Sequence, residues 1–126
     1  MMTETELAEQ MAKERHRTLN IWRDAVALAS EVYGHTAAFP DAERFGLTSQ
    51  LWCAAVSVAS NIAEGSKRLT AENANFLRYA LGSLSECDTQ LLIAENLGFA
   101  TYPTRLKASI MSLTMGIRAY AKTLKP

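Results

Sequence analysis

The most constraining feature of this sequence is a run of nineteen residues without charge. From Phe45 to Ala63 the chain reads FGLTSQLWCAAVSVASNIA. At about 100° per residue, its apolar residues spread over an arc of about 200° on a helix, roughly twice the stripe that a surface helix needs. They are Ala54, Val58, Leu51, Ile62, Ala55, Ala59, Trp52, Ala63 and Val56. One core cannot easily cover so wide an arc, so we expect a second side of this helix to be buried.

The rest of the helix surface is polar but uncharged. It carries Ser49, Ser60, Cys53, Ser57, Gln50 and Asn61. This composition is too polar for a membrane helix and too poor in charge for an ordinary solvated face. We therefore predict that another copy of the protein covers this side, including Trp52, Val56 and Ala63. Asn61 and Glu64, with Glu86 further along the chain, would then make hydrogen bonds at that boundary.

The chain of 126 residues suits one domain and reads as four periodic segments. We predict helices over about 19–37, 43–64, 70–96 and 103–124, after an N-terminal extension, 1–18, that is either helical or disordered. Thr3 and Glu6 have the form of a capping box, so a helix either begins early or precedes the first bundle helix. Short connections favour antiparallel neighbours. The predicted fold is all-α, an antiparallel up-down-up-down four-helix bundle.

Three of the four segments repeat apolar residues at spacings of three and four. In 19–37 these are Trp22, Ala25, Val26, Ala29, Val32 and Tyr33. In 70–96 they are Leu77, Ala80, Leu84, Cys87, Leu91 and Ala94. In 103–124 they are Leu106, Ile110, Leu113, Ile117, Tyr120 and Leu124. Each set predicts one core-facing side.

Glycine and threonine mark the expected helix ends. Gly65 stands where a left-handed terminator would end the second helix, Thr70 is a predicted N-cap, and Gly98 closes the third helix. With a hairpin at 67–69, Gly82 would lie roughly level with Ala54 and Ala55. Small residues there would let the two backbones approach closely, which is a hypothesis that a solvent-facing Gly82 would remove.

Two stretches together resemble a known family. QLWCAAVSVASNIAEG, followed by RYALGSLSECDTQLLIAENLGF, is similar to the large-subunit (23S) rRNA intervening-sequence proteins. Members show a Q-L-x-x-A-x-x-S-I/V-x-x-N-I-A-E-G pattern and a G-S-x-x-E pattern on the next helix. The first fits Gln50, Leu51, Ala54, Ser57, Asn61, Ile62, Ala63, Glu64 and Gly65, and the second fits Gly82, Ser83 and Glu86. The resemblance covers about Leu19 to Leu124.

The resemblance implies an up-down bundle that assembles into a homopentameric ring and has no established enzymatic activity. The chain is also similar to the accessory proteins of diversity-generating retroelements, pentameric bundles whose basic surface is taken to hold nucleic acid and a reverse transcriptase. It departs from the pattern at Trp52 and Cys53, where many relatives carry arginines. The residues expected at an oligomer boundary or as buried polar groups are Gln50, Trp52, Val56, Ser57, Asn61, Ala63, Glu64, Gly82, Ser83 and Glu86.

The charge balance gives little support to a nucleic-acid partner. Thirteen Lys and Arg balance thirteen Asp and Glu, whereas nucleic-acid-binding domains usually carry a basic excess. The last segment nevertheless places four cations within about 60° on a helical wheel. They are Lys107, Arg118, Lys122 and Lys125. Lys67 and Arg68, in the turn between the second and third helices, could extend such a surface. A nucleic-acid-binding accessory protein thus remains the alternative function.

No sequence motif points to an enzyme. There is no H-E-x-x-H, G-x-x-x-x-G-K-[ST] or G-x-G-x-x-G, and neither His16 nor His35 follows a glutamate by three residues, as bundle di-iron sites require. We expect no catalytic residue, metal or cofactor, and we expect Cys53 and Cys87 to be buried reduced thiols. Without a signal segment or a membrane span, a cytoplasmic location is expected. The sequence predicts an oligomeric scaffold or adaptor whose main partner is itself, with another protein possible and no membrane association.

Overall fold

The computed structural model describes residues 1–124, which contain helices and no strand. The α-helices are α1 (Glu4–Ala12), α2 (Asn20–His35), α3 (Leu47–Ser66), α4 (Thr70–Asn96) and α5 (Thr104–Thr123). Three short 3-10 turns connect them, η1 (Arg15–Thr18), η2 (Thr36–Ala38) and η3 (Asp41–Glu43). The predicted all-α class is confirmed.

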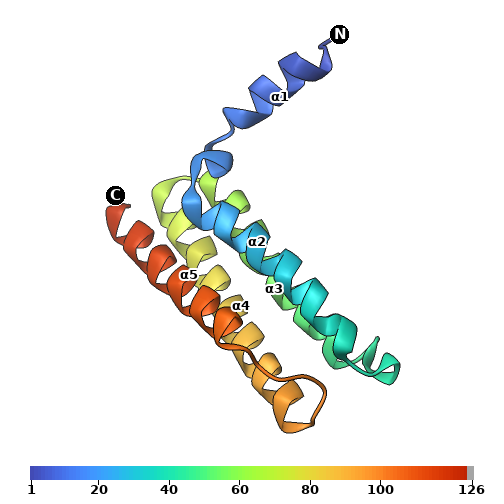
Figure 1. Cartoon of the computed structure of the whole chain (residues 1–126). Helices are drawn as coiled ribbons and strands as arrows, with labels where there is room; N and C mark the ends of the chain where they lie inside the picture. The colour runs from blue at the N-terminus through green and yellow to red at the C-terminus, as the bar shows by residue number, and fades with distance from the viewer. Residues whose placement is uncertain (125–126) are drawn as a thin grey trace.

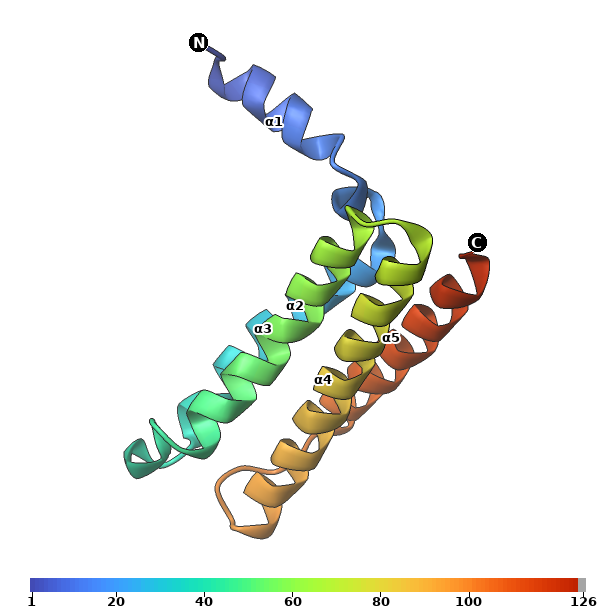
Figure 2. The same cartoon turned by 180° about the vertical axis from the view of Figure 1, so that it is seen from behind.

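Helices α2 to α5 lie side by side, and each runs opposite to the one before it (Figure 1). α3 packs against both α2 and α4, and α5 completes the arrangement by packing against the same two helices. Figure 2 shows the four from behind, with the α3/α4 pair in front. A single apolar core therefore lies between them. No helix in this part of the chain is both long and apolar enough to cross a membrane.

The periodicity of the last two helices is confirmed by burial. All six predicted residues of α4 are buried, as are Leu106, Ile110, Leu113 and Ile117 of α5, while Tyr120 and Leu124 are half-buried. Cys87 lies within this core, and burial raises the pKa of its thiol to about 12. The expectation that Cys53 is also buried is wrong, because its position on α3 faces outward.

The predicted core face of α2 is wrong in part. The buried residues of this helix are Ile21, Ala25, Leu28 and Val32. Val26 and Tyr33 are 40% and 45% exposed. They form a second apolar stripe with the same helical spacing. This stripe lies on the side of α2 that borders α3. Spacing alone cannot tell the two stripes apart, because both satisfy the helical period.

Helix α1 is a separate helix that precedes α2. The Thr3 hydroxyl accepts a hydrogen bond from the Glu6 backbone N–H, 3.1 Å, which confirms Thr3 as the N-cap. Every residue of α1 is exposed. The helix extends beyond the end of the four others, and its main neighbour is η1 (Figure 1).

Gly65 is not a left-handed terminator but lies inside the last turn of α3. A Cβ atom at this position would lie 2.6 Å from Asn73 Oδ1 and 2.8 Å from Phe76 Cβ. The absence of a side chain therefore lets α3 approach the first turns of α4. The hypothesis of a close approach at Gly82 is wrong, because Gly82 is exposed and a Cβ there would meet nothing within 4 Å.

The other helix ends differ only slightly from expectation. α3 begins at Leu47, after η3 and a turn over residues 44–46. Glu43 Oε1 accepts a hydrogen bond from the Leu47 N–H, 3.2 Å. Thr70 is the first residue of α4 and not its N-cap, which is Leu69 without a side-chain hydrogen bond. Gly98 has φ 76°, a left-handed conformation that ends α4 as predicted.

Candidate functional site

The solvent-facing side of α3 carries no charge over the first seventeen residues of the helix. We call this surface the α3 outer face, made up of Ser49, Gln50, Cys53, Val56, Ser57 and Ser60. Val56 is 43% exposed. Trp52 and Ala63, which were also expected at a boundary between copies, are half-buried in the single chain. The structure thus leaves part of the wide apolar arc of α3 uncovered.

An apolar groove runs between α2 and one side of the α3 outer face. It consists of two adjoining hollows of about 510 and 520 Å³. Val26, Tyr33 and Val56 contribute to its apolar wall, together with Ala29 and Ala59. The Tyr33 ring stacks on Trp52 with centroids 4.6 Å apart and an interplanar angle of 8°. Trp52 Nε1 donates to Thr36 Oγ1 at 2.8 Å, so the indole is fixed as one wall of the groove.

A polar groove of about 380 Å³ lies on the other side of α3, against α4. Ser57 and Ser83 share a hydrogen bond between their hydroxyls, 2.8 Å. Asn61 Nδ2 donates to both the carbonyl and the hydroxyl of Ser57, each at 2.9 Å. The structure therefore brings together three of the residues predicted as buried polar groups.

Gln90 in this polar groove was not anticipated from the sequence. Its side chain is 9% exposed, and its Oε1 has no hydrogen-bond partner among the described residues. A buried amide oxygen without a donor is unfavourable by about 1–3 kcal/mol. The residue lines the groove beside Gln50 and Glu86. The only sequence signal for it is its helical spacing from Ser83, seven residues away on the same face of α4.

Both predicted boundary glutamates are exposed in the single chain. Glu86 lines the rim of the polar groove. Glu64 forms an ion pair with Arg68, and Arg68 also lies 3.6 Å from Glu72. The hydrogen bond to Glu64 raises the pKa of the Arg68 guanidinium. Glu64 is therefore satisfied within its own chain by a surface contact, which usually contributes little to stability.

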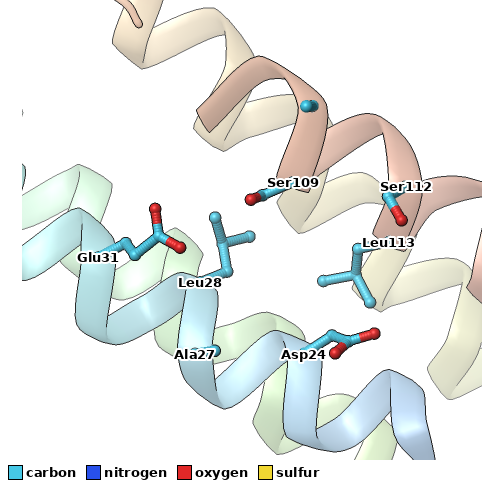
Figure 3. A pocket seen from close by; sticks show the side chains of 8 residues that line it. Asp24, Ala27, Leu28, Glu31, Ser109, Ser112 and Leu113 are labelled. Atoms are coloured by element: carbon cyan, nitrogen blue, oxygen red, sulfur yellow. The ribbon is translucent and has the colours of Figure 1, made fainter. Parts of the chain in front are cut away.

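A third groove, between α2 and α5, was missed by sequence reasoning. It has a volume of about 400 Å³, and Asp24 and Glu31 of α2 line it opposite Ser109 and Ser112 of α5 (Figure 3). Glu31 also accepts a hydrogen bond from Arg105 Nε, 3.0 Å. No group of three or more His, Cys, Asp or Glu side chains in residues 1–124 could hold a metal ion. The lining of this groove mixes these polar side chains with Leu28 and Leu113.

The predicted basic residues divide into paired and unpaired ones. Lys67 Nζ lies 2.6 Å from Glu14 Oε2, and this contact lowers the pKa of Glu14. Lys107 Nζ lies over the Tyr102 ring, 5.1 Å from its centroid. Arg118 and Lys122 are exposed and form no ion pair within residues 1–124. Lys125 lies outside the described residues.

Comparison with known proteins identifies a family. The family model of the 23S rRNA-intervening sequence proteins matches residues 17–115, from η1 to within α5. A search of curated proteins finds no match. The matched region includes the α3 outer face, both grooves beside it and the two sequence patterns that first suggested the resemblance. The chain belongs to the 23S rRNA-intervening sequence protein family.

Proposed function

We propose that this protein is a non-enzymatic scaffold, acting in the cytoplasm, that assembles from copies of itself through the α3 outer face. The protomer is an up-down-up-down four-helix bundle. The observation that carries the proposal is the charge-free face of α3 lying between an apolar and a polar groove. A second copy would cover this face, which no segment within residues 1–124 covers.

The apolar groove supplies the driving force for this contact. Val26, Tyr33 and Val56 are each 40–45% exposed in the single chain. Fully burying a side chain of this size contributes about 1.5–3 kcal/mol, so covering the exposed parts of three such residues on each of two copies is a substantial gain. Polar and uncharged neighbours such as Ser60 can be desolvated at a modest cost, unlike lysine or glutamate.

The polar groove supplies specificity. A donor from a neighbouring copy would satisfy Gln90 Oε1, which has no hydrogen-bond partner within residues 1–124. The two sides of α3 therefore differ in chemistry, which suits a head-to-tail contact better than a contact of one surface with itself. Head-to-tail contacts with the right rotation close into rings. Five copies is the number that the family resemblance implies.

Placing a negative charge on the α3 outer face tests the proposal. Ser60→Glu should leave the protomer folded, because Ser60 is exposed. It should also reduce assembly strongly, because a carboxylate would be buried between copies. Light scattering after size exclusion is expected to give about five times the protomer mass of 13.9 kDa for the wild type and mostly single protomers for the variant.

Ala71→Glu, which adds the same charge at an exposed site on α4, serves as the control and should assemble like the wild type. Circular dichroism verifies the fold of both variants. The proposal would be contradicted if the wild-type protein were monomeric at all concentrations, or if Ser60→Glu assembled as well as the wild type.

The second candidate function is binding of nucleic acid on α5. It is supported by Arg118 and Lys122, whose side chains are exposed and unpaired within residues 1–124. A ring would repeat these charges on every copy and so strengthen a weak phosphate-binding surface. Lys67 and Arg68 add less, because each already contacts a glutamate.

Gel-shift titrations with RNA and DNA between about 50 and 200 mM salt test this alternative. If it holds, replacing both Arg118 and Lys122 with Gln should lower the slope of log affinity against log salt by about 2. Lack of binding by the wild type at the lowest salt concentration would eliminate it.

A further inference from the structure

Helix α1 lacks the packing that a helix of its length needs. It has nine residues, none of them buried. Isolated helices shorter than about 12–15 residues are marginal in water, and one N-cap contributes only about 1 kcal/mol. The family match begins at residue 17, so α1 lies outside the matched region. Another surface must therefore cover α1 if it is to persist as a helix.

One side of α1 has the pattern of a docking face. Leu7 and Met11, each 47% exposed, are four residues apart and so share a side of the helix. Glu4 lies on the same side, one turn before Leu7. The helix contains three glutamates and no lysine or arginine. Its partner surface should therefore be apolar at the centre and basic at the end that meets Glu4.

The outer side of α5 has this complementary pattern. Met111 and Met115 are 58% and 62% exposed and lie one turn apart. Lys107 precedes them by one turn, and Arg118 and Lys122 follow on the same side of the helix. Methionine side chains are flexible and adapt well to an apolar partner. Arg118 and Lys122 have no ion pair within residues 1–124 and are free to receive carboxylates.

We propose that α1 of one copy packs on the outer side of α5 of a second copy. In the antiparallel arrangement, Leu7 lies against Met115 and Met11 against Met111. Along α1, Leu7 follows Glu4 by three residues and Met11 follows Leu7 by four. Along α5 in the opposite direction, Met115 lies three residues from Arg118 and Met111 lies four residues from Met115, so the two series match. Glu4 then lies beside Arg118. Apolar burial and charge complementarity act together along this contact.

The structure directs α1 away from its own α5. Glu14, just after the helix, is held by Lys67, and Arg15 Nη2 donates to the Tyr120 hydroxyl, 3.2 Å. Backbone hydrogen bonds from Lys13 to Gln10 and from Glu14 to Met11 continue the helix into this anchored segment. Both Figure 1 and Figure 2 show α1 extending past the end of α5. Folding back within one chain would break these contacts, whereas reaching a neighbour would not.

Disulfide trapping between two differently tagged variants tests the contact. In a Cys53→Ser background, one variant carries Leu7→Cys and the other carries Met115→Cys; the native Cys87 is buried. After mixing and mild oxidation of the full-length proteins, we expect the mixed dimer to exceed that of a Glu9→Cys control by about tenfold. Glu9 lies on the opposite side of α1, where no partner thiol would be concentrated near it.

Charge reversal at Arg118 and Lys122, with Glu at both positions, should lower the mixed-dimer yield several-fold at low salt, because Glu4 would then face like charges. A mixed-dimer yield equal to that of the Glu9→Cys control overturns the proposal. The proposal is also overturned if a single chain that carries both cysteines forms an intramolecular disulfide whose yield does not depend on protein concentration. This contact lies outside the α3 outer face. Disulfide trapping therefore tests the α1–α5 contact, and light scattering of Ser60→Glu tests assembly through the α3 outer face, so either proposal can fail without the other.

Discussion

Gly65→Ala is expected to lower the free energy of unfolding by about 1–3 kcal/mol, although alanine is normally the better helix former. The added methyl group would lie 2.6 Å from Asn73 Oδ1 and 2.8 Å from Phe76 Cβ. Both atoms belong to helix α4, and Phe76 Cβ is fixed close to the backbone, so the helices must move apart. Urea denaturation at a fixed protein concentration measures the change.

Gly34→Ala is the matched control, because Gly34 also lies near the end of a helix and a Cβ there would meet nothing within 4 Å. This change should stabilise the protein by about 0.5–1 kcal/mol, since it only removes freedom from the unfolded chain. The two substitutions are chemically identical and should have opposite signs. A stabilising effect at both sites would show that α3 and α4 are not in tight contact at Gly65.

Leu51→Ala should have the largest effect of a single truncation in α3, lowering the free energy of unfolding by about 2–5 kcal/mol. Leu51 is 0% exposed, and its removal leaves a cavity in the core. Val56→Ala on the same helix is the comparison. Val56 is 43% exposed, so its truncation should change protomer stability by only about 0.5 kcal/mol.

Thermal or urea unfolding at low protein concentration, where assembly contributes least, separates the two substitutions. Light scattering at higher concentration should show weaker assembly for Val56→Ala, because its side chain lines the apolar groove. Similar losses of protomer stability for both variants would mean that the apparent outer face of α3 belongs to the core.

Helical periodicity predicted the helices and most of the core. In α4 and α5 a single apolar stripe repeats on each helix, and the residues of those stripes are largely buried. α2 carries two adjacent stripes, and the sequence prediction mixed them. Val26 and Tyr33 satisfy the same spacing as Val32, but only packing against α3 and α5 decides which stripe faces inward.

Glycines were harder to interpret, because a glycine can be required for its backbone conformation or for its lack of a side chain. Gly98 was predicted correctly from the first requirement. Gly65 is required for its lack of a side chain, and this requirement comes from Asn73 and Phe76 of another helix. The orphaned oxygen of Gln90 is likewise a property of three-dimensional surroundings that a glutamine in a helical pattern does not reveal.

The hydrogen bond between Ser57 and Ser83 also limits how α3 and α4 can move. A slide by one helical turn, about 5.4 Å, would separate these hydroxyls. It would also carry Asn61 or Ile62 toward the space that only Gly65 can occupy. Polar pairing and steric exclusion thus permit a single alignment of the two helices. A partner that docks on either helix therefore cannot act through a one-turn ratchet of α3 past α4.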